Sequence, residues 1–317
     1  MVDPRDGSLQ RPSDAAPERL DRVLRAFRPQ LSWRALRELV ARGKVTVSGQ
    51  MVTDAGALIV GGAEVAIEME RRRAGTVARA PATVLPKERI VFCDRFVVVA
   101  DKPSGVDVAP FEAKGKVRGV VEPSVLPPLV DQVAAALGAP VRVVHRLDRD
   151  TTGLVMFARN EEAEAKLAHQ LRRHTVHRRY LAVAHGEVQG STIRSFLVDD
   201  RGDGRRGSTS NHRIGREAVT HVEVLERLTG ATLIACRLET GRTHQIRIHL
   251  AEAGHMLLGE RGYTREHHGP TLAAPRIMLH AAELGFVHPD TGEDRRFTSA
   301  TPPDMDECVR HIRPDPV

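Results

Sequence analysis

The chain has 317 residues, a net charge of +6 and 3% aromatic residues, and its isoelectric point lies near 9.6. This length allows a substantial core and two domains, and the basic charge favours a polyanionic partner. Three scattered cysteines exclude a disulfide framework and a Cys-rich zinc site. No apolar run approaches the roughly 20 residues of a membrane helix, and the start is polar with mixed charge, unlike a signal peptide. We therefore expect a cytoplasmic protein without membrane segments and with a disordered tail over residues 1–17.

The first folded unit is predicted over residues 18–70. Apolar residues recur at helical spacing in Leu20–Phe27. Ser32 is placed to cap a second helix, and short β-rich runs follow at Val45–Val47 and Ala63–Ile67. Two helices and a small sheet are therefore expected.

The second of these helices carries basic side chains away from its apolar positions. Such side chains suit RNA phosphates, although charge spacing alone is more typical of a solvated helix surface. The run Leu31–Gly49 also resembles the S-four-like RNA-binding domain, and Trp33 stands where that family commonly carries a basic residue. The resemblance implies RNA contacts from Arg34, Arg37, Arg42 and Lys44.

Residues 71–86 read Arg-Arg-Arg followed by Ala, Gly, Thr and Pro without a sustained apolar period, which predicts a linker. From residue 87 to 317, hairpin-like spacing without regular strand–helix alternation favours an α+β fold with a mixed, largely antiparallel sheet. A glycine- and arginine-rich stretch at residues 199–216 predicts a mobile basic loop. The expected strands are Ile90–Phe92, Phe96–Ala100, Tyr180–Ala184, Val219–Leu225, Thr232–Leu238 and Ile277–Phe286, and the expected helices are Leu129–Leu137 and Glu161–Arg173.

One polar turn, His145–Leu154, lies between two apolar strand candidates. Asp148 is at its centre, flanked by Arg146 and Arg149. A carboxylate held between guanidiniums suits a nucleophile better than a proton donor. An aspartate before Thr-Thr-Gly is also ordinary turn chemistry, in which the side chain accepts backbone N–H groups.

This turn closely resembles the signature of the RluA family of RNA pseudouridine synthases, with Thr152 where the family usually has serine. Three more stretches match in family order, and the matches extend from about Lys87 to about Pro303. They are Asp101–Gly105, Arg179–Val183 and Thr240–Arg247. A further segment departs from the family in having Met256 and Glu260 where proline and aspartate are usual. The resemblance implies the pseudouridine synthase fold for residues 87–317, preceded by the small α/β S-four-like domain.

The implied reaction, conversion of uridine to pseudouridine, breaks the bond between the sugar and a base nitrogen and rejoins the sugar to a ring carbon. It needs a nucleophile or charge stabiliser, a base for proton removal and a closed pocket, and it needs no metal or cofactor. The resemblance assigns the catalytic carboxylate to Asp148, its ion-pair partner to Arg247, and stacking on the target uracil to Tyr180, which matches the family's proposed general base. The structural alternatives are a core position for Tyr180 and a surface helix position for Arg247.

The resemblance also implies a set of substrate contacts. Arg146 matches the position that fills the space left by an everted base, since a planar guanidinium can replace the lost stacking. The other substrate-binding residues lie within the Thr240–Arg247 match and are Arg242, His244 and Gln245. The histidines of this region lack the spacing of a helical zinc motif, so no metal site is expected.

We expect an RNA pseudouridine synthase that acts as a monomer on large-subunit ribosomal RNA, with transfer RNA as the alternative substrate. The low aromatic content predicts that phosphate and shape contacts supply most of the RNA affinity. Two other functions remain open, a catalytically silent RNA-binding or ribosome-assembly protein and an Asp-nucleophile hydrolase. Such hydrolases generally need a second carboxylate or a metal, and neither is evident near Asp148 in the sequence.

Overall fold

The computed structural model describes residues 7–41, 43–48, 50–52, 55–67, 84–110, 126–202 and 205–314. The chain divides into an N-terminal unit, residues 1–81, and a C-terminal unit, residues 82–317. The linker predicted at residues 71–86 lies outside the described residues up to position 83. Leu85 corrects its end, because this side chain is 1% exposed and packs in the main core of the C-terminal unit.

The N-terminal unit contains two helices and a small sheet, as the sequence predicts. Its elements are β1 (Gly7–Gln10), β2 (Glu18–Arg19), α1 (Leu20–Phe27), α2 (Trp33–Ala41), β3 (Val45–Val47), β4 (Gln50–Met51), β5 (Leu58–Ile59) and β6 (Glu64–Ile67). Four strands form a sheet in the order β1-β6-β3-β4, and β2 pairs with β5. Leu20 and Leu24 of α1 pack with Leu36 and Val40 of α2 in a fully buried cluster. The Ser32 hydroxyl caps α2 by accepting a hydrogen bond from the Ala35 N–H at 3.2 Å.

Strand β1 corrects the prediction of a disordered tail over residues 1–17. Residues Gly7–Gln10 pair antiparallel with β6, and Arg11 is 7% exposed. The Arg11 guanidinium donates hydrogen bonds to the carbonyls of Ile59 and Ala16. A buried guanidinium that satisfies distant backbone carbonyls fixes this segment, a contact that local composition does not reveal.

The C-terminal unit is built on one large sheet. Its elements are η1 (Lys87–Arg89), β7 (Ile90–Cys93), β8 (Val97–Lys102), α3 (Leu129–Leu137), β9 (Arg142–Val143), β10 (Thr152–Ala158), α4 (Glu161–Arg172), β11 (His177–His185), β12 (Ser191–Val198), β13 (Gly207–Thr209), β14 (Arg216–Leu228), β15 (Ala231–Leu238), α5 (Gln245–Glu252), β16 (Leu279–Val287), β17 (Asp294–Thr298) and α6 (Pro303–His311). The strands follow the order β13-β12-β14-β15-β11-β16-β10-β8-β7, with β9 on β10 and β17 on β16.

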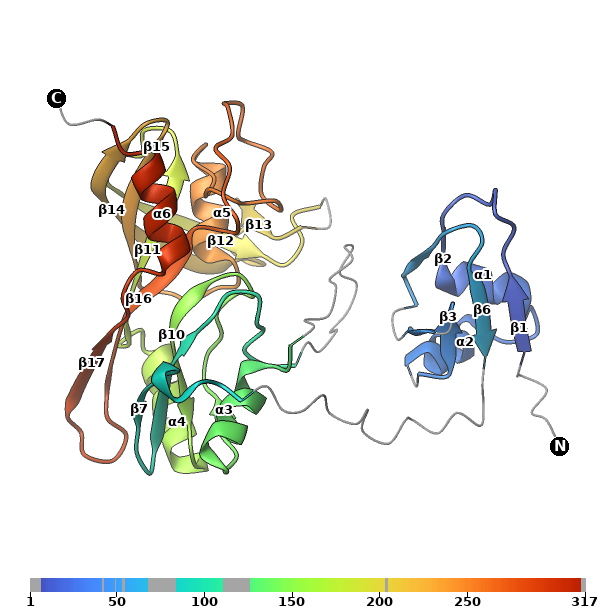
Figure 1. Cartoon of the computed structure of the whole chain (residues 1–317), viewed down its shortest axis with the longest axis horizontal. Helices are drawn as coiled ribbons and strands as arrows, with labels where there is room; N and C mark the ends of the chain where they lie inside the picture. The colour runs from blue at the N-terminus through green and yellow to red at the C-terminus, as the bar shows by residue number, and fades with distance from the viewer. Residues whose placement is uncertain are drawn as a thin grey trace. The chain divides into compact units, whose positions relative to one another are not determined.

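Within the described part of this sheet, the strand pairs are antiparallel except β10 with β16, which run parallel. The sheet is therefore mixed and largely antiparallel, and the predicted α+β class is confirmed. Figure 1 shows α3 and α4 at the β7–β10 end of the sheet and α5 and α6 at the β11–β15 end. No helix in the described residues is long and apolar enough to span a membrane.

The parallel pair brings three strands together around Ala281. On one side Gly153 of β10 lies opposite Ala281, and on the other side Tyr180 of β11 does. Gly153 has φ +104°, and a Cβ on it would lie 2.3 Å from the Ala281 carbonyl oxygen. Only glycine fits this approach. Strands β10 and β11 therefore lie on either side of β16, which brings the turn before β10 and Tyr180 to neighbouring parts of the sheet.

The basic stretch at residues 199–216 is more ordered than predicted where the structure describes it. Strand β13 pairs with the end of β12, and the Ser208 N–H donates a 2.9 Å hydrogen bond to the Glu252 carboxylate on α5. Residues 203 and 204 lie outside the described part. The prediction of a loop throughout was wrong at Gly207–Thr209. The composition of this stretch, rich in glycine and arginine, is typical of a loop, yet these three residues form a short strand that pairs with the preceding strand β12.

Candidate active site

The turn that carries Asp148 joins β9 to β10 and is closed by its own backbone. The Thr151 N–H donates to the Asp148 carbonyl at 3.1 Å. Lys102, 0% exposed, donates from Nζ to the carbonyls of Arg149 at 2.6 Å, Val106 at 2.8 Å and Pro103 at 2.9 Å. Burial lowers the pKa of Lys102 to about 7, although nearby carboxylates, Asp150 first among them, oppose this. The Lys102 amino group ties the turn to the segment after β8, which holds the backbone of Asp148 in place.

Two polar contacts, one partly buried and one buried, fix the ends of the turn. The Met156 N–H donates to His145 Nε2 at 3.1 Å, and burial, with the nearby Arg178 guanidinium, lowers the pKa of His145 to about 3. The ring is therefore neutral and able to accept. At the other end the Thr152 hydroxyl lies 2.9 Å from His280 Nδ1. Threonine in place of the usual serine keeps this hydroxyl contact.

Replacing Thr152 with valine is expected to lower stability by about 1–3 kcal/mol, because the buried His280 nitrogen loses its partner. For a unit of this size the melting temperature should fall by about 3–10 °C. Calorimetry of Thr152→Val beside Thr152→Ser measures this directly. The serine variant should melt within about 2 °C of the wild type, and equal melting of the valine variant would contradict the role given to the hydroxyl.

Arg247 on α5 joins two carboxylates. Its Nη1 donates to Asp148 Oδ2 at 3.2 Å, while Nε and Nη2 bind both oxygens of Glu260 at 2.7 and 2.9 Å. The Arg247 side chain is 11% exposed and that of Glu260 is 0% exposed. Burial opposes the charge on Arg247, but the hydrogen bonds to Glu260 and the field of Asp148 outweigh it and raise the pKa of Arg247. Arg247 is therefore not a surface helix residue.

Glu260 shapes the loop that follows α5. Its Oε1 accepts backbone N–H bonds from Arg261, Gly262 and Tyr263 at 3.0, 2.7 and 3.2 Å. Burial raises the pKa of Glu260, but the hydrogen bonds from Arg247 and these N–H groups prevail and lower it. Because the bidentate pair with Glu260 neutralises Arg247, Asp148 keeps a net negative charge while one of its oxygens is held in place.

His244 and Tyr263 line the other side of the Asp148 carboxylate. His244 Nε2 lies 3.7 Å from Asp148 Oδ1, and His244 Nδ1 lies 2.7 Å from the Tyr263 hydroxyl. Burial lowers the pKa of His244 more than Asp148 raises it, which favours the neutral ring. The guanidinium of Arg247 lies 5.2 Å from the centre of the Tyr263 ring. The Asp148 side chain is 21% exposed, so it is packed on these sides yet open to an incoming group.

Tyr180 faces the same region from β11. A bulge between β11 and β16 falls between Arg179 and Tyr180, and bulges redirect side chains. The Tyr180 residue is 8% exposed. Burial raises the pKa of its phenol, Arg178 opposes this, and the negative charge of Asp148 adds to it. The phenol is therefore protonated at neutral pH and close enough to Asp148 to feel its charge.

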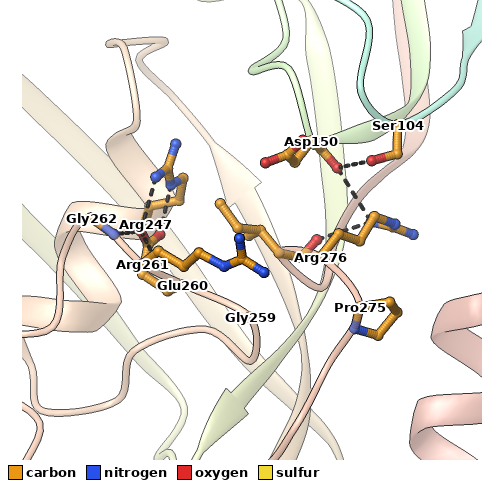
Figure 2. Close-up of a pocket in the computed structure, with 10 residues that line it drawn as sticks. Ser104, Asp150, Arg247, Gly259, Glu260, Arg261, Gly262, Pro275 and Arg276 are labelled. Atoms are coloured by element: carbon orange, nitrogen blue, oxygen red, sulfur yellow. Dashed lines mark hydrogen bonds and ion pairs between the residues drawn. The ribbon is translucent and has the colours of Figure 1, made fainter. Parts of the chain in front are cut away.

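A cavity of about 320 Å³ adjoins Arg247. Figure 2 shows Arg247 with Glu260 at one end, Asp150 with Ser104 and Arg276 at the other, and the guanidinium of Arg261 between them. Its volume lies in the range of small-ligand pockets. Because Arg247 and Arg276 already bind the carboxylates of Glu260 and Asp304, Arg261 is the lining guanidinium best suited to a phosphate.

The other residues predicted to contact the substrate differ in how exposed they are. Arg146 is exposed beside Asp148, whereas Arg242 is partly buried and donates from Nε to the Glu217 carbonyl at 3.0 Å. Gln245 is 2% exposed. Its amide nitrogen donates to the Val219 carbonyl and the Thr220 hydroxyl, both at 3.0 Å. Its amide oxygen accepts from the Thr240 hydroxyl at 2.8 Å and from the Arg242 N–H at 3.0 Å. The prediction of a substrate contact is therefore corrected for Gln245, whose side chain instead holds the loop before α5.

The predicted RNA-binding residues of the N-terminal unit lie on or near α2. Arg37 donates to Asp21 Oδ2 at 3.1 Å and is 58% exposed. Lys44 lies just after the helix and is half-buried. Arg34 belongs to α2, and Arg42 lies outside the described residues. Their contacts with RNA stay predictions.

Comparisons with known proteins identify the family. Residues 96–252 match the family of RNA pseudouridylate synthases. The chain is 36% identical to the uncharacterized RNA pseudouridine synthase YlyB of Bacillus subtilis, over 93% of this chain and 94% of that protein. The chain belongs to the RluA family of RNA pseudouridine synthases.

Further similar proteins agree with this. The ribosomal large subunit pseudouridine synthase D of Zymomonas mobilis is 36% identical over 90% of this chain and 91% of its own length. The human RNA pseudouridylate synthase domain containing 4 shares the fold, with a TM-score of 0.55 and 20% identity over 71% of this chain and 92% of that chain. The chain is thus an RNA pseudouridine synthase, an isomerase, and the predicted class of enzyme is confirmed.

Sequence reasoning overlooked three residues of this pseudouridine synthase site. Lys102 lies in the matched stretch Asp101–Gly105, but no role was predicted for it. Glu260 was noted only as a departure from the family, and no role was predicted for Tyr263. Signals for them were present, since Tyr263 is one of two tyrosines in the chain and a lysine followed by Pro-Ser-Gly is an unusual residue to end a buried strand. In the part of the chain that the structure describes, no group of three or more His, Cys, Asp or Glu side chains is placed to hold a metal ion.

Proposed function

We propose that this pseudouridine synthase modifies large-subunit ribosomal RNA and uses Asp148 as its catalytic carboxylate. The RNA target is supported by the names of the relatives, several of which are ribosomal large subunit pseudouridine synthases. The single observation that carries the catalytic assignment is the ion pair between Asp148 and Arg247, formed in a turn whose backbone is tied down by Lys102. Transfer RNA is the alternative target.

The arrangement fits the demands of the isomerisation. The bond between C1′ of the ribose and N1 of uracil breaks, the ring turns, a bond between C1′ and C5 forms, C5 loses a proton and N1 gains one. Asp148 supplies the negative oxygen that attacks the nucleoside or stabilises positive charge on it. Arg247 holds Oδ2, so we assign Oδ1, which lies 3.7 Å from His244 Nε2, to the substrate. Glu260 prevents Arg247 from cancelling the charge that the reaction needs.

The target uridine has to leave its stack to reach Asp148. We assign Arg146 to the space that the base vacates, because its guanidinium is exposed two residues before Asp148 and is planar like a base. Arg261 and the adjoining cavity are suited to a phosphate beside the everted nucleotide. Cytoplasmic location and a monomeric state stay predictions.

Tyr180 is proposed to stack on the uracil and to accept its C5 proton as the phenolate. Because burial raises the pKa of Tyr180 above its ordinary value near 10, the phenolate is scarce at pH 7 and increases with pH. The rate of the chemical step should therefore rise by up to about tenfold per pH unit between pH 7 and 9. Tyr180→Phe should keep RNA affinity within about threefold, lose about 100-fold or more in rate, and lose this pH dependence.

Single-turnover rates of both proteins across this pH range measure the effect. A wild-type rate that is flat with pH, together with a Tyr180→Phe rate within tenfold of it, would restrict Tyr180 to stacking and packing. Tyr263→Phe provides a second tyrosine for comparison, because its hydroxyl contacts His244 and not the substrate in this account. It should leave the pH dependence unchanged.

Incubation of the purified protein with unmodified RNA tests the proposed function. Transcripts of large-subunit ribosomal RNA and of transfer RNA are digested to nucleosides afterwards. Isomerisation converts uridine to a nucleoside of the same mass and different retention, whereas a hydrolase releases free base or phosphate. We expect pseudouridine in the ribosomal transcript. Pseudouridine confined to the transfer RNA would overturn the proposed target, and no product in either RNA would favour a silent RNA-binding protein.

A further inference from the structure

Trp33 is an exposed aromatic side chain that the catalytic account does not use. It is the single tryptophan of the chain and the first residue of α2. Its side chain is 43% exposed, and it is the one aromatic among the exposed large apolar residues of the described part. Exposing an indole forfeits the favourable free energy of burying a large ring, so the exposure points to a ligand.

Two arginines hold their guanidiniums beside the indole. The Arg25 guanidinium lies 5.9 Å from the ring centre and that of Arg37 lies 5.8 Å from it. Each is anchored at a second point, because Arg25 donates to the Leu31 carbonyl and Arg37 to Asp21 at 3.1 Å. The indole is therefore oriented by cation–π contacts from both helices of the unit.

The charge around this indole is positive. Asp21 is 1% exposed and also binds Arg19, with Nη2 to Oδ2 at 2.9 Å. One buried carboxylate thus faces two guanidiniums, and Arg25 adds a third positive charge next to Trp33. An aromatic face among guanidiniums is the combination that binds single-stranded nucleic acid, in which bases stack and phosphates pair with cations. A neutral or basic protein surface would lack the negative charge that complements this site.

We propose that Trp33 is a stacking platform for one unpaired base of the RNA substrate, with Arg25 and Arg37 contacting the phosphates on either side of that base. The proposal rests on the proposed RNA function and deepens it. Base stacking discriminates against duplex RNA, since paired bases present no free face. The N-terminal unit therefore selects a loop, bulge or single-stranded segment of RNA.

The single tryptophan makes the test direct, because all indole fluorescence of the full-length protein comes from Trp33. We would titrate the protein with an oligouridylate of about eight nucleotides, with a fully paired RNA duplex of equal charge that has no loop, and with an abasic strand of equal length. The oligouridylate should quench the fluorescence to saturation, and the duplex and the abasic strand should leave it nearly unchanged. Quenching should be the same in Asp148→Asn, which separates this site from the catalytic turn.

Variants at position 33 measure the contribution of the ring. Measured with an end-labelled oligouridylate, because these variants lack the indole, Trp33→Ala and Trp33→Leu should bind about 5- to 150-fold more weakly than the wild type, while Trp33→Phe keeps most of the affinity. Their affinities for the abasic strand should equal that of the wild type. The leucine and phenylalanine variants retain apolar bulk, so they decide the matter if the alanine variant folds poorly. Val60→Ala is the matched control, an apolar residue of the same unit that is 60% exposed, and should not change binding.

The outcomes separate the two proposals. If the wild type binds RNA but all Trp33 variants bind equally well and the fluorescence does not respond, the stacking platform is overturned and the RNA function stands. If the wild type binds no RNA at all, both proposals fail. A loss of affinity in Trp33→Leu that is as large for the abasic strand as for oligouridylate would assign Trp33 to folding of the unit and would also overturn the platform.

Discussion

Replacing Asp148 with asparagine is expected to lower the rate of pseudouridine formation by about 10⁴-fold or more, as loss of a catalytic nucleophile or its charge does in other enzymes. The substitution keeps the size of the side chain and removes its charge. RNA affinity should change by less than about threefold, because phosphate contacts elsewhere supply most of it. Stability should change little, since Arg247 retains its bidentate partner Glu260. Single-turnover rates and binding curves on the same RNA measure both effects.

Glu187→Gln is a suitable control, because it makes the equivalent change at an exposed carboxylate of the C-terminal unit. It should retain the wild-type rate. An Asp148→Asn protein that is folded, binds RNA and reacts within about tenfold of the wild type would remove Asp148 from the chemistry. In that case the ion pair with Arg247 would have a structural role alone.

Replacing Arg247 with methionine is expected to lower both stability and activity. The variant leaves the carboxylate of Glu260, which is 0% exposed, without its cation. Breaking a buried ion pair in this way costs about 3–5 kcal/mol, so the melting temperature of the C-terminal unit should fall by about 6–20 °C. The rate should fall by about 100-fold or more, because Asp148 loses the group that orients it.

A second substitution separates the two effects. In Arg247→Met combined with Glu260→Gln, the buried group is neutral and its amide oxygen still accepts the N–H groups of the following loop. Most of the stability should return, while the rate stays low because nothing holds Asp148. Arg313→Met is the matched control, because Arg313 forms a bidentate pair with Glu226 at the surface and is 53% exposed. It should leave the melting temperature nearly unchanged. Recovery of the rate in the double variant would contradict the orienting role of Arg247.

Local sequence patterns were sufficient for several elements whose partners or caps lie nearby. The structure confirms the predicted helix Leu129–Leu137 with both ends unchanged, since a proline precedes it and Gly138 closes it in the left-handed region at φ +63°. The hairpin of β7 and β8 was likewise visible, because its strands are adjacent in the chain. Strands β1, β12, β13 and β17 were missed. Strand β1 pairs with β6 near the other end of its unit, and β13 lies in a stretch whose composition is that of a loop.

The sequence predicted the parts of the candidate site that lie within one short motif. It did not predict which side chains are buried or which distant residues they contact. The turn around Asp148 was read from its own residues, but its pairing with Arg247, 99 residues away in sequence, came from the family resemblance. Gln245 was placed among the substrate contacts because it lies within the Thr240–Arg247 stretch that resembles the family. Helical geometry turns successive side chains by a large angle, so Arg247 points to the turn while Gln245 points into the core. Sequence neighbours therefore need not share a site.

Mapping pseudouridines in the ribosomal RNA of cells tests the central claim most directly. Cells that lack this protein are compared with the same cells carrying either the wild-type gene or the Asp148→Asn variant. We predict that one or a few uridines of the large-subunit RNA are unmodified without the protein, regain pseudouridine with the wild type, and stay unmodified with the variant. A pseudouridine map that is identical in all three, or one that the variant restores as fully as the wild type, would contradict the account.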